Sequence, residues 1–363
     1  MMDGADPAVV RRALSDRDPL SGTDGFAGEL DGALVRDVLG RYPAFYEREA
    51  GDPAASGDWS FDPTELTDPE SVPAGHRVDA SRSEQVLSLP DPSPCPDDAA
   101  AVAAVRDAVS ESVDAVSTDG LAIAFSGGLD SAILAARLDA PLYVAGFPDS
   151  HDVEAARSAA ELLDADLTVV ELTHDDLVDA VPRIARATGR TNAMDVQIAL
   201  GLFLAADRAA GDGFDRLAVG QGADELFGGY AKVAKAPDDP RVDADTVRGA
   251  RREVVLGLPD QLERDVLTLR AAGVEPVAPL LHDSVVEAAL ELPGDLLVAS
   301  DGTRKVALRR AAREWLPDEI AERDKKAVQY GSLVSRELDR LARQAGFKRR
   351  MDDHVGKYVA SLL

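Results

Sequence analysis

Two glycine-rich segments combine small residues, hydroxyls and carboxylates in an order that suits phosphate chemistry. The first, Ser126-Gly127-Gly128-Leu129-Asp130-Ser131, directly follows the apolar run 121–125. Glycines let the backbone approach a ligand closely, and successive N–H groups ahead of a helix attract phosphate oxygens. The Asp130 carboxylate would repel a bare phosphate but can hold Mg²⁺ beside one. The segment therefore predicts a site for a metal–nucleotide complex, with Ser126 and Ser131 as hydroxyl donors.

The second segment is residues 219–230, V-G-Q-G-A-D-E-L-F-G-G-Y, which also follows a predicted strand. Its Asp224 is the second Mg²⁺ candidate beside Asp130. The chain contains no G-x-x-x-x-G-K-[ST] sequence, so it lacks the lysine and hydroxyl that grip terminal phosphates in that kind of loop.

The elements that position these segments alternate between apolar runs and helical patterns. Strands that are apolar throughout and separated by helices indicate a doubly wound parallel sheet covered on both faces, and hence an α/β fold. Beyond about residue 240 the pattern is mostly helical, as at 285–292 and 306–315. The predicted strands are 121–125, 142–146, 167–172 and 216–219, and the predicted helices of this part are 131–138, 153–163, 177–187 and 196–210.

Three regions are expected along the chain. Residues 1–96 are rich in Asp, Pro, Gly and Ser, and predict a small β-containing domain with long turns. A helix start at Asp97 opens the α/β domain, which we place at 97–340, and a helical tail occupies 341–363.

Charge and composition exclude several functions. A net charge of −27 opposes binding to nucleic acid, and no run of eighteen apolar residues occurs to span a membrane. The first residues lack the pattern of a signal peptide, so we expect a cytoplasmic protein. The single cysteine, Cys95, excludes a disulfide framework. The chain has 46 Asp and 20 Glu against 32 Arg and 7 Lys, and we interpret this acidity as halophilic adaptation to a salty cytoplasm. Because lysine is scarce, each lysine is a candidate for a specific role.

The two glycine-rich segments carry a family resemblance. Residues 126–131 resemble the pyrophosphate-binding loop of the N-type ATP pyrophosphatases, and 219–230 resemble the corresponding segment of asparagine synthetases. Weaker similarities extend the resemblance over about residues 97–335. They are the strand and adenosine-side loop at 145–152, the Pro-Leu segment at 274–281, and the Arg-x-Lys sequence Arg323-Asp324-Lys325.

The resemblance implies an amide-forming ligase that uses ATP and Mg²⁺. In that family the loop cleaves ATP between its α- and β-phosphates, and a small-molecule carboxylate, aspartate, becomes an acyl-adenylate that ammonia attacks. The resemblance makes Lys325, Lys305 and Gln221 the catalytic candidates, and Asp130 and Asp224 the metal ligands. It places ATP and pyrophosphate on Ser126, Gly127, Gly128, Leu129, Asp130, Ser131, Gly146, Phe147, Gly220 and Gly222.

Three positions depart from the family pattern and leave the acceptor open. Gln221 stands where the family usually has glutamate, and an amide cannot act as a carboxylate base. Met194 and either Val277 or Ala278 stand where the family has arginines, and a bidentate Arg–carboxylate contact contributes roughly 1.5–3 kcal/mol. One alternative is a ligase for another acid, a tRNA or a cofactor precursor. The other is a nucleotide-binding regulator without catalysis.

The N-terminal region resembles pieces of the glutaminase half of the same enzymes, at 34–43 and 72–76. That half uses an N-terminal cysteine with its own α-amino group as base. Met2 stands at that position and Cys95 lies at the far end of the region. We therefore expect a shortened region without glutaminase activity, and ammonia from solution or from a separate glutaminase. A homo-oligomer is compatible with the sequence.

Overall fold

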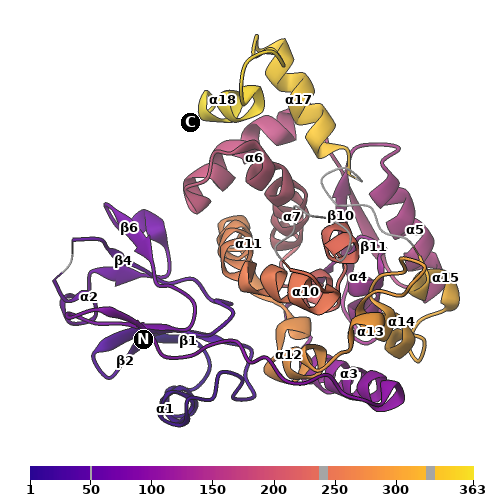
Figure 1. Cartoon of the computed structure of the whole chain (residues 1–363). Helices are drawn as coiled ribbons and strands as arrows, with labels where there is room; N and C mark the ends of the chain where they lie inside the picture. Colours follow the sequence, from indigo (N-terminus) through magenta and orange to yellow (C-terminus); the bar gives the residue numbers. More distant parts are fainter. Residues whose placement is uncertain (50, 237–243, 324–331) are drawn as a thin grey trace. The chain divides into compact units, whose positions relative to one another are not determined.

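The structure is a computed structural model and describes residues 1–49, 51–236, 244–323 and 332–363 (Figure 1). The chain forms two compact units, each built from three separate stretches. The first unit comprises 1–116, 220–263 and 278–314, and the second comprises 117–219, 264–277 and 315–363. The predicted boundaries at residues 96 and 340 stay a prediction.

The second unit is built on a five-stranded sheet in the order β11-β10-β9-β12-β13, and every neighbouring pair is parallel. This confirms the predicted α/β fold class. The first strand in sequence, β9, lies in the middle, so the chain winds outward from it in both directions. Such a switch point is where open α/β sheets bind ligands. The strands are β9 Leu121–Ala124, β10 Leu142–Gly146, β11 Leu167–Glu171, β12 Arg216–Ala218 and β13 Glu275–Val277.

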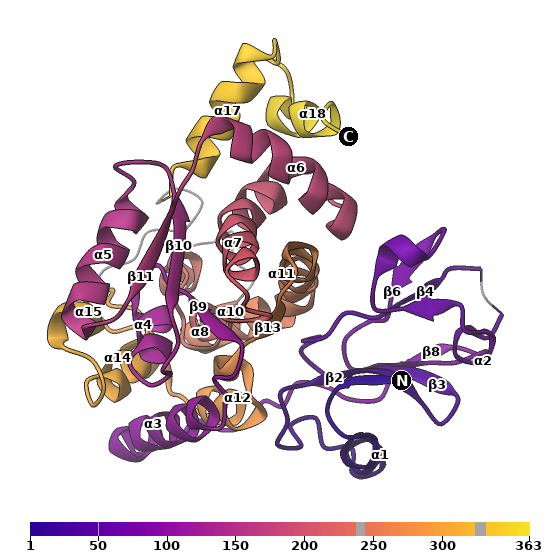
Figure 2. The same cartoon turned by 180° about the vertical axis from the view of Figure 1, so that it is seen from behind.

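Helices cover both faces of this sheet, which explains its continuous apolar strands. Figure 2 shows β10 and β11 between α5 on one side and α7 on the other. All five residues of β10 are consequently buried. The helices of the second unit are α4 Leu129–Ala135, α5 His151–Leu163, α6 His174–Thr188, α7 Ala193–Gly211, α15 Asp318–Ala321, α17 Val334–Gln344 and α18 His354–Ala360.

The predicted strands of the sheet agree with the structure to within one residue, and the four predicted helices to within three. Three of these helices, α5, α6 and α7, begin earlier than predicted because a polar cap precedes the first apolar residue. Thr173 forms a capping box with Asp176 at α6, and Asn192 caps α7 by accepting from the Asp195 N–H. One further helix, α11 Leu258–Ala272, contains the chain boundary between the units at residue 264.

The N-terminal part of the first unit holds two small antiparallel sheets, in the orders β1-β2-β3-β7-β8 and β5-β4-β6. A small core of Ala27, Leu34, Ala44, Val72 and Val78 lies between short strands. The elements are β1 Met2–Gly4, α1 Pro7–Asp16, β2 Phe26–Leu30, β3 Ala33–Arg36, β4 Phe45–Glu47, α2 Pro53–Ser56, β5 Trp59–Ser60, the 3₁₀ helix η1 Pro63–Glu65, β6 Pro69–Ser71, β7 His76–Val78 and β8 Ser83–Gln85.

The rest of the first unit is helical: α3 Asp98–Asp114, α8 Ala223–Leu226, α9 Ala231–Lys235, α10 Val247–Leu256, η3 Pro279–Leu281, α12 Asp283–Leu290, α13 Gly294–Leu297 and α14 Val306–Ala312. A buried arginine joins this part to the N-terminal sheets. Arg41 lies 2.9 Å from Asp37 and 2.8 Å from Asp283, and these two charges raise the pKa of its guanidinium although burial alone would lower it. In the described part of the chain, no helix is long and apolar enough to cross a membrane.

Candidate active site

The loop after β9 contains a glycine that its backbone geometry requires. Gly127 has a φ of +69°, in the left-handed region that side chains disfavour. A Cβ at this position would also lie 2.4 Å from the Ala155 carbonyl oxygen of α5. Both reasons predict that only glycine fits. The close approach at Gly127 is to α5, whereas the sequence indicated close approach to a phosphate.

Ser131 closes the same loop from within. Its Oγ accepts a hydrogen bond from the Ser126 N–H at 3.2 Å and donates to the Gly128 carbonyl at 3.3 Å. The hydroxyl that we predicted as a phosphate donor is therefore engaged inside the loop, and it holds the turn in shape. The Ser126 hydroxyl lies 3.4 Å from Ser131 Oγ and is half-buried.

Asp130 lies in the first turn of α4, next to Leu129. Both residues are only 4% exposed. Gly128 is the N-cap of this helix and as a glycine offers no side chain to cap it. The first-turn N–H groups are thus left to other acceptors, and a carboxylate stands beside them. This combination suits a phosphate that carries a metal ion.

The loop after β10 places Gly146 and Phe147 at the end of a buried strand. A Cβ on Gly146 would lie 2.6 Å from Ser150 Oγ, the hydroxyl that caps α5. The Phe147 N–H donates to the Ser332 carbonyl at 3.2 Å, and its ring lies 5.7 Å from that of His174. The predicted adenosine-side residues are therefore held by the segment that leads into α17.

Arg323 contacts the loop after β9, a contact that the sequence did not predict. Its Nη1 donates to the carbonyls of Gly127 at 3.3 Å and Ala155 at 2.9 Å, and its Nη2 to Ser158 Oγ at 3.1 Å. The sequence signal at this position is the Arg-x-Lys resemblance, which implies a role for the lysine and none for the arginine. That lysine, Lys325, lies outside the described residues.

In the first unit, the segment after β12 begins with Gly220 and Gly222. Gly222 has a φ of +90° and caps α8, and a Cβ there would lie 2.4 Å from Leu281 Cδ2. Gln221, between the two glycines, is half-buried. The tight turn sets the start of α8, and with it the position of Asp224.

Asp224 forms an ion pair with Lys305, which is the N-cap of α14. Lys305 Nζ lies 2.5 Å from Asp224 Oδ1, and the lysine side chain is 7% exposed. Gly229 makes room for the pair, since a Cβ on it would lie 2.0 Å from Asp224 Oδ1 and 2.4 Å from Lys305 Cε. Arg304 donates a hydrogen bond to the Gly229 carbonyl. The structure thus brings together two predicted residues from distant segments.

Glu225 is buried beside this ion pair. Burial and the neighbouring Asp224 charge raise its pKa, against a hydrogen bond from the Tyr230 hydroxyl that lowers it. The Glu225–Tyr230 contact ties α8 to the turn at Gly228 and Gly229.

Each glycine-rich loop carries one of the two carboxylates predicted to hold Mg²⁺, Asp130 and Asp224. In the described ranges no three His, Cys, Asp or Glu side chains converge as a metal cage. Magnesium commonly uses only one or two carboxylates together with phosphates and water. Asp130 belongs to the second unit, whereas Asp224 belongs to the first and is paired with Lys305. A metal shared by the two carboxylates stays a prediction.

The structure also shows where two residues lie that differ from the family pattern. Met194 lies in the first turn of α7 and is 62% exposed. Val277 ends β13, and its carbonyl accepts the Val219 N–H at 2.9 Å. Neither side chain can form the salt bridge that an arginine would make with an acidic substrate.

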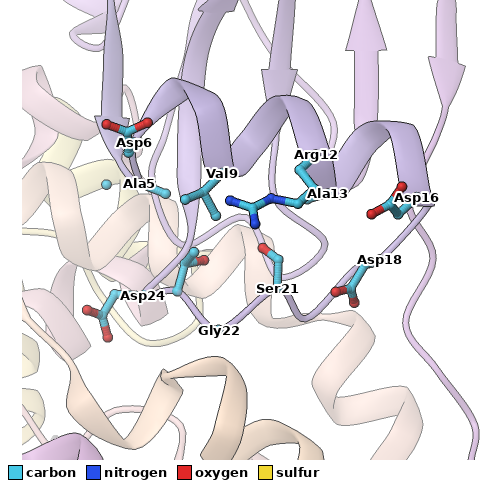
Figure 3. Close-up of a pocket in the computed structure, with 12 residues that line it drawn as sticks. Ala5, Asp6, Val9, Arg12, Ala13, Asp16, Asp18, Ser21, Gly22 and Asp24 are labelled. Atoms are coloured by element: carbon cyan, nitrogen blue, oxygen red, sulfur yellow. The ribbon is translucent and has the colours of Figure 1, made fainter.

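An open hollow of about 490 Å³ lies in the N-terminal region (Figure 3). Helix α1 forms one wall, from which Arg12 points across the hollow, and residues 18–24 form the other. It carries none of the predicted ATP-binding residues. Near the end of that region Cys95 is a free thiol, and Met2 pairs with Gly28 in the β1–β2 ladder.

Comparison with known proteins adds to this geometry. Residues 104–254 and 246–356 match the asparagine synthase family model. A putative glutamine-hydrolysing asparagine synthetase of Methanocaldococcus jannaschii is 30% identical over 273 residues, which cover 65% of this chain and 50% of that protein. Asparagine synthetase B of Escherichia coli is 25% identical over 249 residues, covering 62% and 44%.

An asparagine synthetase domain-containing protein of Saccharomyces cerevisiae is 26% identical over 283 residues, covering 63% of this chain and 51% of that protein. The chain thus spans about half the length of the curated relatives it matches.

Proposed function

Because the chain belongs to the asparagine synthase family, we propose that it is an ATP-dependent ligase that forms an amide. In this proposal ATP is cleaved between the α- and β-phosphates, a small-molecule carboxylate is adenylated, and ammonia displaces AMP. The observation that carries the proposal is the 126–131 loop, which is both matched by the family and shaped around Gly127 at the switch point of the sheet.

The chain's own residues are assigned roles in the same proposal. Backbone N–H groups of Gly128 and Leu129 bind the departing pyrophosphate, and Gly146 and Phe147 border the adenosine. Asp130 holds Mg²⁺, which when bound neutralises the charge that develops on the phosphates. Lys305 supplies a fixed cation, and Asp224 orients its ammonium through the 2.5 Å contact. Lys325 and Gln221 remain catalytic candidates.

Aspartate is the proposed acceptor by family, and ammonia is proposed to come from solution or from a separate glutaminase. A different carboxylate acceptor is the second candidate. It is favoured by Met194 and Val277, which stand where the family has arginines that could contact an acidic substrate, and by Gln221, which stands in place of glutamate.

Pyrophosphate exchange into ATP tests the proposal and separates the candidates. The protein is assayed in high-salt buffer with Mg-ATP and labelled pyrophosphate, with aspartate or with other acids one at a time. Exchange with aspartate supports the first reading, and exchange only with another acid supports the second. Nucleotide binding without exchange or AMP formation with any acid and ammonia would refute the ligase and leave a non-catalytic regulator.

A further inference from the structure

The guanidinium of Arg323 joins the phosphate loop to α5 by three hydrogen bonds. One of its nitrogens donates to two backbone carbonyls, at Gly127 and Ala155, and the other donates to Ser158 Oγ. The Ala155 oxygen is also the atom that a Cβ on Gly127 would strike, at 2.4 Å. Arg323 therefore contacts the loop at the point where loop and helix come closest.

The hydrogen bond to the Gly127 carbonyl sets the direction of a neighbouring N–H group. In a planar trans peptide the C=O and N–H bonds point in opposite directions. With the Gly127 carbonyl facing Arg323, the N–H of Gly128 must face away from Arg323. Reversing this peptide would present a carbonyl oxygen where the N–H now lies, and that oxygen would repel a phosphate.

A Gly-Gly peptide is free to make that reversal unless something holds it. Neither residue has a Cβ, so both signs of φ are open to each. Gly127 already has a φ of +69°. The hydrogen bonds of Ser131 hold the Ser126 N–H and the Gly128 carbonyl, which belong to other peptides. Among the described residues, Arg323 is the one that donates a hydrogen bond to the Gly127 carbonyl.

We propose that Arg323 is a positioning residue that fixes the Gly127–Gly128 peptide with its N–H toward the pyrophosphate; the inference rests on the proposed function of this loop. Arginine suits the task because its rigid fork reaches two carbonyls and a hydroxyl at once, and it keeps its charge at all working pH values. Lysine carries the same charge but not the fork.

Ligand affinities of four variants test this role. Binding of Mg-ATP, pyrophosphate and AMP is measured calorimetrically for R323Q, R323K, S158A and the control R157Q. Arg157 is an exposed arginine of α5, the helix that also carries Ser158, and it pairs with Glu171. We expect the Kd for ATP and pyrophosphate to rise about tenfold or more in both Arg323 variants, with AMP within about twofold of wild type. S158A and R157Q should resemble wild type, because neither removed contact reaches the loop.

Several results would overturn the role. Wild-type pyrophosphate affinity in R323Q would do so, as would full affinity in R323K, which would mean that charge alone matters. An equal loss for AMP and pyrophosphate would indicate general damage to the fold instead.

A crystal structure of ligand-free R323Q separates this inference from the proposed function. A reversed Gly127–Gly128 peptide supports the positioning role even if the wild-type protein binds neither ATP nor pyrophosphate, a result that would refute the proposed function alone. An unchanged peptide together with unchanged binding overturns the positioning role.

Discussion

Lys305 and Asp224 meet at 2.5 Å, although they belong to different helices and lie far apart in the sequence. The lysine takes a left-handed backbone conformation, with a φ of +59°, at the N-cap of α14. Non-glycine residues adopt this conformation at some energetic cost, which the surrounding structure must offset. A strained backbone and a buried cation at one position agree with a functional role for Lys305.

A double-mutant cycle should detect the coupling between these two residues. We expect D224N, K305M and the double variant to give a coupling free energy of about 0.5–3 kcal/mol in urea unfolding, because the pair is largely shielded from water. The exposed pair Arg157–Glu171, at 3.5 Å, is the matched control and should give less than about 0.5 kcal/mol. Equal coupling in both pairs would contradict the shielded geometry.

Replacing Gly229 by alanine should separate activity from stability. The new methyl group would overlap Asp224 Oδ1 and Lys305 Cε, so the pair must shift. We expect a loss of about 1–3 kcal/mol in unfolding free energy and a roughly 100-fold loss of pyrophosphate exchange. The control G211A lies in α7 with open space around the added atom in the described structure, and should leave both quantities close to wild type. Full exchange activity in G229A would show that the pair is dispensable.

Gly127 and Gly189 allow backbone strain to be separated from crowding. Their φ angles are nearly equal, +69° and +67°, but among the described residues only Gly127 has atoms near the position of a Cβ. G189A should cost about 1–2 kcal/mol through φ alone. G127A should cost a further 1–3 kcal/mol or so by overlap with α5 and should lose ATP binding. Similar unfolding free energies for the two variants, measured in urea, would rule out the crowding.

The buried Arg41 should matter more to stability than an exposed arginine. R41M leaves Asp37 and Asp283 buried without its charge, and we expect a loss of about 3–5 kcal/mol. R48M removes an exposed partner of Asp68 and should cost under about 1 kcal/mol. Thermal or urea unfolding measures both. A small effect of R41M would mean that water reaches this site.

Acid should weaken the contact between α6 and α17. Burial alone would raise the pKa of Glu337, but hydrogen bonds from His174, Arg336 and Arg340 outweigh it, so its pKa falls below the ordinary value of 4.5. A carboxyl whose pKa is lowered by folding adds stability above its unfolded pKa and loses it as the pH falls through the folded one. The difference in unfolding free energy between wild type and E337Q should therefore be largest near neutral pH and shrink below 4.5.

The control for this pH series is E171Q, which changes an exposed carboxylate on β11. Urea unfolding between about pH 7 and pH 3 gives the comparison. A wild-type advantage over E337Q that stays constant across this range would contradict the lowered pKa.

Local patterns predicted the central sheet well. The runs at 121–125 and 142–146 are apolar because helices cover both faces, so each strand could be located from its own residues. The Gly-rich loop after β9 could also be located from its own residues, but the positive φ of Gly127 and its contact with α5 came from the structure. The strands and the loop could be predicted because each is determined by residues that are adjacent in the sequence.

Contacts between distant segments were beyond the sequence patterns. The Lys305–Asp224 pair needs the positions of α8 and α14, and Arg323 reaches Gly127 only because α5 and the loop are already packed together. The short strand β13, with Glu275 exposed, carries too few apolar residues to predict its pairing with β12. The N-terminal sheets posed the same difficulty, since their strands have two to five residues.

The central position of β9 affects how the chain assembles during synthesis. On one edge β9 pairs with β10, which emerges from the ribosome soon after it. On the other edge β9 pairs with β12, which is synthesised much later and ends at Ala218. Four helices, α4 to α7, are made between β9 and β12 while this strand edge stays open. An open edge can recruit strands from other chains. Translation that stalls between residues 146 and 216 should therefore leave a nascent chain prone to aggregate, with the nucleotide loop still half built.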